Sequence, residues 1–173
     1  MWCTRVSWGV KADLGLRLQS RQTANCMKVI EKTVLLTHSA HQMYALVTDV
    51  ASYPAFLPWC SEGTVLETHD DGVTAKLGMS LAGFTHHFVT RNIMVPERSL
   101  DMRLVDGPFS HLEGRWDFHD LGTPEDPASK VVFDLKYDFS SAMLARLVGP
   151  VFDKIAASLV DAFVQRANAL YGD

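Results

Sequence analysis

The chain has 173 residues, of which 47% are apolar and 21% are charged. This composition is typical of one soluble domain and excludes disordered, collagenous and coiled-coil chains. No run approaches the roughly 20 consecutive apolar residues that a membrane-spanning helix needs. The formal net charge is −4, so the chain lacks the positive charge that drives non-specific nucleic-acid binding, and we expect no DNA partner. Three cysteines without a CxxC spacing (Cys3, Cys26 and Cys60) indicate neither a disulfide framework nor a zinc site.

Residues 1–26 differ from the rest of the chain. They contain four basic residues and one acid, whereas residues 27–173 hold 12 basic and 19 acidic side chains. One interpretation is a targeting peptide, because organelle presequences are rich in Arg and poor in acids. The interpretation we favour is an N-terminal extension, disordered or arising from a misplaced start, because a strand-like run follows directly after Met27. The sequence therefore predicts a single domain over residues 27–173.

The first predicted elements are a strand and a helix. Residues 28–36 (KVIEKTVLL) are rich in β-branched side chains, which predicts a strand. Ser39 then offers an N-cap for a helix over residues 40–50, in which apolar side chains recur at helical spacing. Residues 51–58 contain two prolines four positions apart, so they can form only a short, irregular helical turn.

A series of strands follows, because apolar and polar side chains alternate with a period of two between turn residues. The predicted strands cover residues 61–69, 73–81, 84–95, 99–105, 109–119 and 131–139. The period then changes to 3.6, which predicts a long helix with an apolar stripe from Leu144 to Leu170 and with Asp153 and Asp161 solvated. Gly149-Pro150 should kink or restart this helix, because proline lacks a backbone N–H.

This order of elements predicts an α+β fold with one antiparallel sheet and its helices on one face. Most strands have one charged parity, and their other parity is crowded with aromatic side chains. A strongly curved sheet around a helix leaves a gap where the helix cannot follow the curvature, and Gly78, Gly83 and Gly114 suit such bends. Inward aromatic side chains also serve as plain core, and periodicity does not distinguish a ligand cavity from a filled interior.

Four segments of the sequence together resemble those of one known family. They are residues 50–60 (VASYPAFLPWC), 107–109 (GPF), 112–118 (LEGRWDF) and 159–167 (LVDAFVQRA). From Met27 to Tyr171 the chain resembles the coenzyme-Q-binding START-like family, which includes bacterial ribosome-association toxins and lies within the polyketide-cyclase-like superfamily. The resemblance implies a helix-grip fold, in which a curved antiparallel sheet wraps around the C-terminal helix and encloses a tunnel for a lipid-like molecule.

The candidate ligand contacts are aromatic and aliphatic side chains, each weighed against a role in core packing. Tyr53, Phe56 and Trp59 surround two prolines, which favours a place at the tunnel mouth. The candidates on the sheet side are Phe84, Phe88, Phe109, Trp116 and Phe118. The candidates on the helix side are Phe152, Ile155, Leu159 and Phe163. An extended apolar lining of this kind would suit an isoprenoid tail.

Catalytic and metal-binding patterns are missing from the sequence. His86 and His87 are adjacent on a strand and therefore point to opposite faces, so they cannot bind one metal ion. The acids of the predicted strands, such as Glu113 and Asp117, fall on the outward parity, away from any enclosed substrate. Cys60 has no activating base nearby in the pattern. We therefore predict no catalytic residue, no metal and no cofactor.

Three functions remain open at this point. The main hypothesis is a non-catalytic protein that binds ubiquinone or a similar polyprenyl quinone in support of respiration, in the cytoplasm or in peripheral contact with the inner face of the membrane. The first alternative is a toxin of a toxin-antitoxin pair that binds a ribosomal subunit and blocks subunit association, for which Arg91, Arg98, Arg103 and Arg115 could form a local basic patch. The second alternative is a cyclase-like enzyme, which would need inward acids.

Overall fold

The computed structural model describes residues 27–81 and 83–172, so the predicted N-terminal extension lies outside the described residues. The elements are β1 (Lys28–Leu36), α1 (Ala40–Thr48), the 3-10 helix η1 (Val50–Ala55), β2 (Cys60–His69), β3 (Gly72–Leu81), β4 (Phe84–Val95), β5 (Ser99–Asp106), β6 (Phe109–Asp120), β7 (Ser129–Phe139), α2 (Ala142–Leu147) and α3 (Gly149–Tyr171). Each predicted strand and helix is present, with ends that differ by a few residues.

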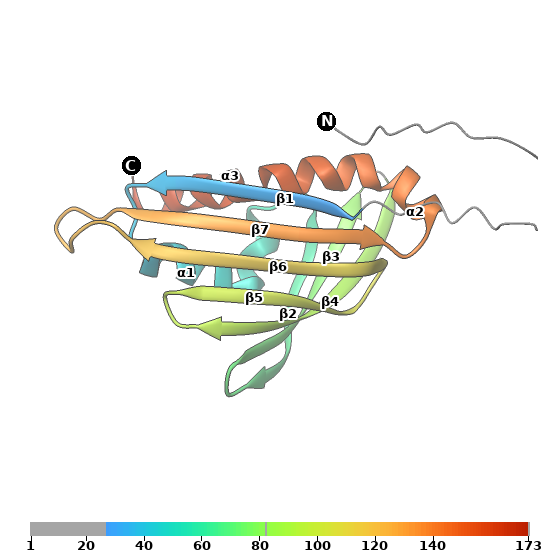
Figure 1. Ribbon diagram of the computed structural model, residues 1–173, viewed down its shortest axis with the longest axis horizontal. Coiled ribbons are helices and arrows are strands. Elements are labelled where there is room, and N and C mark those ends of the chain that lie inside the picture. Colours follow the sequence, from blue (N-terminus) through green and yellow to red (C-terminus); the bar gives the residue numbers. More distant parts are fainter. Residues whose placement is uncertain (1–26, 82, 173) are drawn as a thin grey trace, which may run out of the picture.

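The described residues form one antiparallel sheet of seven strands in the order β1-β7-β6-β5-β4-β3-β2. Strands β2 to β7 follow one another as hairpins, and β1 pairs with β7 at the far edge. Figure 1 shows α3 running along the sheet beside β1, while the strands change direction from β7 towards β3 and β2. The predicted α+β helix-grip fold is confirmed.

Irregular pairing bends the sheet. In β2 the register with β3 shifts at Ser61, which leaves an extra residue and increases the local twist. Gly78 lies opposite this bulge, and a Cβ atom there would lie 2.7 Å from the Ser61 hydroxyl. Gly83 occupies the β3–β4 turn with φ of 84°. Gly114 has a different role from the predicted bend, because it makes room for Met102, whose Cε would lie 2.3 Å from an added Cβ.

The segment before β2 is fixed by local interactions. Ser39 caps α1 as predicted, since its hydroxyl accepts from the Gln42 backbone N–H at 3.2 Å and the Gln42 side chain accepts from the Ser39 N–H at 2.8 Å. The segment with two prolines forms η1, which contains Pro54 and packs against β2. This close packing requires Gly63, because a Cβ atom there would lie 2.1 Å from the Val50 carbonyl oxygen.

The C-terminal helix restarts at Gly149 rather than bending. Pro150 lies in the first turn of α3, where its missing N–H leaves no hydrogen bond unmade. The buried face of α3 consists of Gly149, Phe152, Ala156, Val160, Phe163 and Ala167. The predicted stripe is wrong at Leu170, which is 50% exposed. Small side chains such as Ala156 and Ala167 let the helix approach the sheet, and a pattern drawn from large residues alone misses them.

Polar contacts fasten α3 to the edge of the sheet. Lys28 and Lys32 on β1 form ion pairs with Asp153 and Asp161, so these two acids are partnered and not simply solvated as predicted. The Lys32 ammonium also donates to the Ala157 carbonyl at 3.1 Å. These pairs are partly exposed, so each contributes modest stability, but together they set the position of the helix along β1.

We predict opposite effects on stability for two glycine-to-alanine substitutions. Gly63→Ala should lower the free energy of unfolding by about 1–3 kcal/mol, because the new methyl group overlaps the Val50 carbonyl. Gly149→Ala is the matched control, since its Cβ would lie 3.7 Å from the nearest atom and alanine favours helix by up to about 1 kcal/mol. Urea denaturation followed by circular dichroism measures both, and equal stability of the two variants would contradict the packing described.

Candidate functional site

A cavity lies between the concave face of the sheet and α3, and we call it the central cavity. Its volume is about 70 Å³, which is room for roughly five water molecules. The described residues that line it are Val50, Tyr53, Trp59, Ala75, Leu77, Phe88, Thr90, Asn92, Met102, Leu112, Trp116, Phe133, Leu135, Phe152, Ile155, Ala156, Leu159 and Phe163. The interior therefore contains a cavity between Trp116 and Phe152, and its lining is almost wholly apolar.

The structure brings most of the predicted contacts together at this cavity. The predicted residues in its lining are Tyr53, Trp59, Phe88, Trp116, Phe152, Ile155, Leu159 and Phe163. Three others, Phe56, Phe109 and Phe118, lie outside the lining. The side chain of Phe84 lies outside the described part of the chain.

The three excluded rings pack against other side chains. Phe109 is 4% exposed and contacts Phe152 with ring centroids 5.1 Å apart, so it closes one end of the core. Phe118 meets the Tyr44 ring edge-on at 5.6 Å, beneath α1. Phe56 lies under the Arg166 guanidinium, which is 5.5 Å from its ring centroid. Phe118 has the inward parity predicted for its strand, Phe109 is turned inward by a register shift between Phe109 and His111, and Phe56 follows η1 and is not on a strand.

Trp59, Ile155 and Leu159 form the wall between the central cavity and the outside. The same three residues also line a surface groove, together with Leu57, Pro58, Ser80, Ser158 and Ala162. Trp59 is only partly buried, at the end of the loop that leads into β2. These three side chains therefore stand between the central cavity and the groove.

Sequence reasoning missed the two polar residues in the lining, Thr90 and Asn92. They follow Phe88 at a spacing of two on β4, so the alternation that placed Phe88 inward places them inward too. Thr90 is 3% exposed and Asn92 is 4% exposed. The Asn92 Oδ1 atom is buried and accepts no hydrogen bond from the described residues. Leaving such an acceptor unpaired costs about 1–3 kcal/mol.

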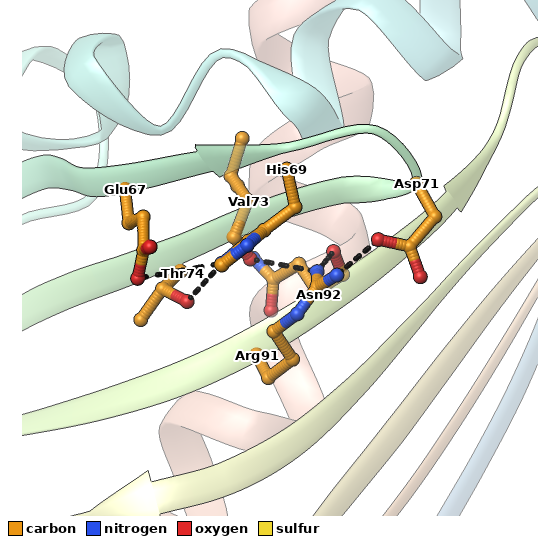
Figure 2. Close-up of polar contacts among 7 residues, drawn as sticks. All are labelled: Glu67, His69, Asp71, Val73, Thr74, Arg91 and Asn92. Atoms are coloured by element: carbon orange, nitrogen blue, oxygen red, sulfur yellow. Dashed lines mark hydrogen bonds and ion pairs between the residues drawn. The ribbon is translucent and has the colours of Figure 1, made fainter.

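The backbone at Asn92 is held firmly from the other face of the sheet. Figure 2 shows the Arg91 guanidinium pairing with Asp71, while it also donates to the Asn92 carbonyl at 2.7 Å and to the Val73 carbonyl at 3.4 Å. Gly72 touches the same carbonyl so closely that a Cβ atom there would lie 2.0 Å from the oxygen. The Asn92 side chain therefore projects inward from a fixed point.

The cavity supplies little for acid–base chemistry. Tyr53 is the titratable side chain among the described lining residues, and its hydroxyl donates to the Val47 carbonyl at 2.6 Å. Burial raises the pKa of the Tyr53 phenol, so it stays protonated at neutral pH. Burial also raises the pKa of the nearby Cys60 thiol, which keeps it in the unreactive protonated form.

The described residues contain neither a metal-binding cluster nor a membrane-spanning helix. No three His, Cys, Asp or Glu side chains gather there closely enough to hold a metal ion. Within the same residues no helix combines the length and the apolar character that crossing a bilayer requires.

The convex face of the sheet does not carry the basic patch suggested by its arginines. Arg115 is held between Asp101 and Asp117, with nitrogen–oxygen distances of 2.8 and 2.7 Å. Arg91 is paired with Asp71 in the same way. Arg103 lies in register with Glu113 on the neighbouring strand. Arg91 and Arg115 are therefore neutralised by acids that sequence spacing alone did not place beside them, while Arg91 also lies in register with Arg103 on β5.

We predict that Asn92→Leu stabilises the protein. Leucine has the same number and branching of side-chain heavy atoms, its extra volume can extend into the cavity, and it removes the unpaired buried acceptor, so the free energy of unfolding should rise by about 1–3 kcal/mol. Asn92→Asp serves as the control and should lower stability, because it buries a carboxylate without a partner. Urea denaturation of the three proteins measures the order, and a loss of stability in Asn92→Leu would mean that the amide is satisfied in solution.

Comparison with known proteins places this arrangement among its relatives. The chain is 41% identical over 143 residues to the ribosome association toxin RatA of Pseudomonas aeruginosa, covering 83% of this chain and 97% of the relative. It is 28% identical over 139 residues to the coenzyme Q-binding protein COQ10 homolog B of Xenopus laevis, covering 80% of this chain and 57% of that one.

A solved structure of similar shape supports the fold assignment. A START superfamily protein from Mycobacterium smegmatis superposes with a TM-score of 0.67 at 23% identity, covering 82% of this chain and 98% of that one. The family described as polyketide cyclase/dehydrase and lipid transport matches residues 36–164, which run from the end of β1 into α3 and include every described residue of the central cavity. The chain therefore belongs to the polyketide cyclase/dehydrase and lipid transport family.

Proposed function

We propose that this protein is a ribosome-association toxin, which binds a ribosomal subunit and opposes the joining of the two subunits. The observation that carries the proposal is the 41% identity to a relative named as a ribosome association toxin, over 97% of that relative's length. This function was the first alternative from the sequence, and the comparisons favour it over the main hypothesis of quinone binding. Ribosome association would place the protein in the cytoplasm.

The charges of the described surface bear on how a ribosome would be contacted. Because Arg91 and Arg115 are neutralised by neighbouring acids, attraction to RNA phosphates cannot rest on these two side chains. Arg98, by contrast, is exposed in the turn between β4 and β5. We infer that shape and specific contacts, rather than a broad positive field, would select the binding site.

Sedimentation tests this proposal. Overproduction of the full chain should increase free ribosomal subunits at the expense of joined ribosomes in sucrose gradients of the lysate. The control is the same transcript with a stop codon in place of Met27, which yields no folded domain. Unchanged subunit profiles at a confirmed level of folded protein would contradict the toxin function.

We also propose that the central cavity binds an apolar ligand, with ubiquinone or a similar polyprenyl quinone as the leading class. A partly open space between sheet and helix, lined largely by aromatic and aliphatic side chains, supports this second function. A relative named as a coenzyme Q-binding protein supports it. The volume of about 70 Å³ is far below the roughly 300–1,000 Å³ of ordinary ligand sites, so binding requires outward movement of a wall such as Trp59.

The ligand function that we propose is non-catalytic, although the family description includes cyclases and dehydrases. Cyclisation and dehydration need a positioned proton donor or acceptor at the substrate. In the described lining, the Tyr53 phenol is already engaged with the Val47 carbonyl, and burial raises its pKa. A carrier or storage role needs only the apolar surface. Loading from a lipid bilayer would require the peripheral membrane contact expected from the sequence.

A pair of variants on α3 tests the ligand function. Ala156 is 2% exposed and lines the central cavity, so Ala156→Leu should fill much of it and abolish co-purification of prenyl quinone. Ala157→Leu places the same side chain on the exposed face of the helix and should leave the bound lipid unchanged. Solvent extraction with mass spectrometry measures the lipid, and circular dichroism checks folding. Absence of prenyl quinone from the wild-type protein, together with no uptake of added quinone, would contradict this function.

A further inference from the structure

The central cavity contains one polar group whose hydrogen-bonding capacity is unused. Asn92 is 4% exposed, and its Oδ1 atom has no partner among the described residues. Around it the lining is apolar, apart from the hydroxyls of Thr90 and Tyr53 and the Trp59 and Trp116 indoles. The Tyr53 hydroxyl is already bonded to Val47. An acceptor buried in an apolar lining is costly to keep unless something in the cavity donates to it.

The Asn92 side chain is buried and its backbone is fixed, so the amide stays away from solvent. Its backbone carbonyl is held by Arg91 at 2.7 Å, and Arg91 is itself anchored to Asp71 at the β2–β3 turn (Figure 2). Close packing of Gly72 against the same carbonyl blocks a shift of the strand in that direction. The β4 strand therefore presents the amide to the cavity, with Thr90 two residues away on the same face and about 7 Å distant along the strand.

We propose that Asn92 selects ligands that carry a hydroxyl group, whose O–H donates to Oδ1. The class is a hydroxylated ring, such as a phenol or the hydroquinone form of a quinone head group. A fully oxidised quinone has only acceptor oxygens, so it would leave Oδ1 unpaired. This inference rests on the proposed ligand-binding function of the central cavity and adds to it the chemistry of the head group.

The central cavity must widen to admit even a single small ring, as the proposed ligand function already requires. An apolar cavity of about 150 Å³ engineered in another protein holds benzene, and the central cavity has about 70 Å³ before any movement of its walls. The ring would lie among Phe88, Trp116 and Phe152, with Asn92 at its polar edge. A tail would leave past Trp59, Ile155 and Leu159, which line both the cavity and the surface groove.

Phenol and toluene test the proposal, because they have nearly the same shape and differ in a hydroxyl against a methyl group. A purely apolar cavity prefers toluene, since phenol loses its hydrogen bonds to water on entry. Isothermal titration of the full chain should show phenol binding about tenfold more tightly than toluene, the ratio that one net hydrogen bond supplies. Asn92→Leu should reverse the preference, whereas Met79→Leu, an apolar exchange in the buried core outside the described lining, should preserve it.

The outcomes separate this inference from the proposed function beneath it. Toluene binding as tightly as phenol in the wild-type protein would overturn the role of Asn92 and leave an apolar ligand site standing. Phenol preference that survives in Asn92→Leu would also overturn it. Failure of the wild-type protein to bind either compound would overturn both the inference and the ligand function. The wild-type comparison decides the matter even if Asn92→Leu does not fold.

Discussion

The incomplete contact between a curved sheet and a straight helix determines the rest of this structure. Bulges in the strands bend the sheet, and part of the inward face of α3, including Ala156, borders the cavity instead of packing on the sheet. Ion pairs from Lys28 and Lys32 help to hold the helix along β1, which limits its approach to the concave face. The space left over is the central cavity, which other elements border but do not fill.

The Asn92 amide is the feature of the cavity lining that lowers stability, because its buried oxygen has no partner among the described residues. An apolar residue in place of Asn92 would fit the surrounding lining better, yet the strand presents an amide there and fixes its backbone through Arg91. Stability given up at a particular buried position commonly marks a functional site. Under the proposal above, Asn92 would supply a hydrogen-bond acceptor in a largely apolar lining.

The two proposed functions use different parts of the molecule. Ribosome binding would involve the outer surface, where Arg115 is paired with Asp101 and Asp117. Ligand binding would involve only the interior. The wall formed by Trp59, Ile155 and Leu159 is the place where the two could meet, since it belongs to both the cavity and a surface groove. A shared fold therefore permits either function, and relatives bearing either name share it.

The sequence by itself determined the elements and most of the inward faces, because alternation along a strand and capping at Ser39 are local properties. It also indicated eight of the eighteen described residues in the cavity lining, including Trp116 and Phe152. Only the tertiary structure decided that Phe118 packs under α1, that Arg115 sits between two acids, and that Asn92 faces an empty space. These facts depend on where distant strands and α3 come to rest, and no local spacing in the chain encodes those distances.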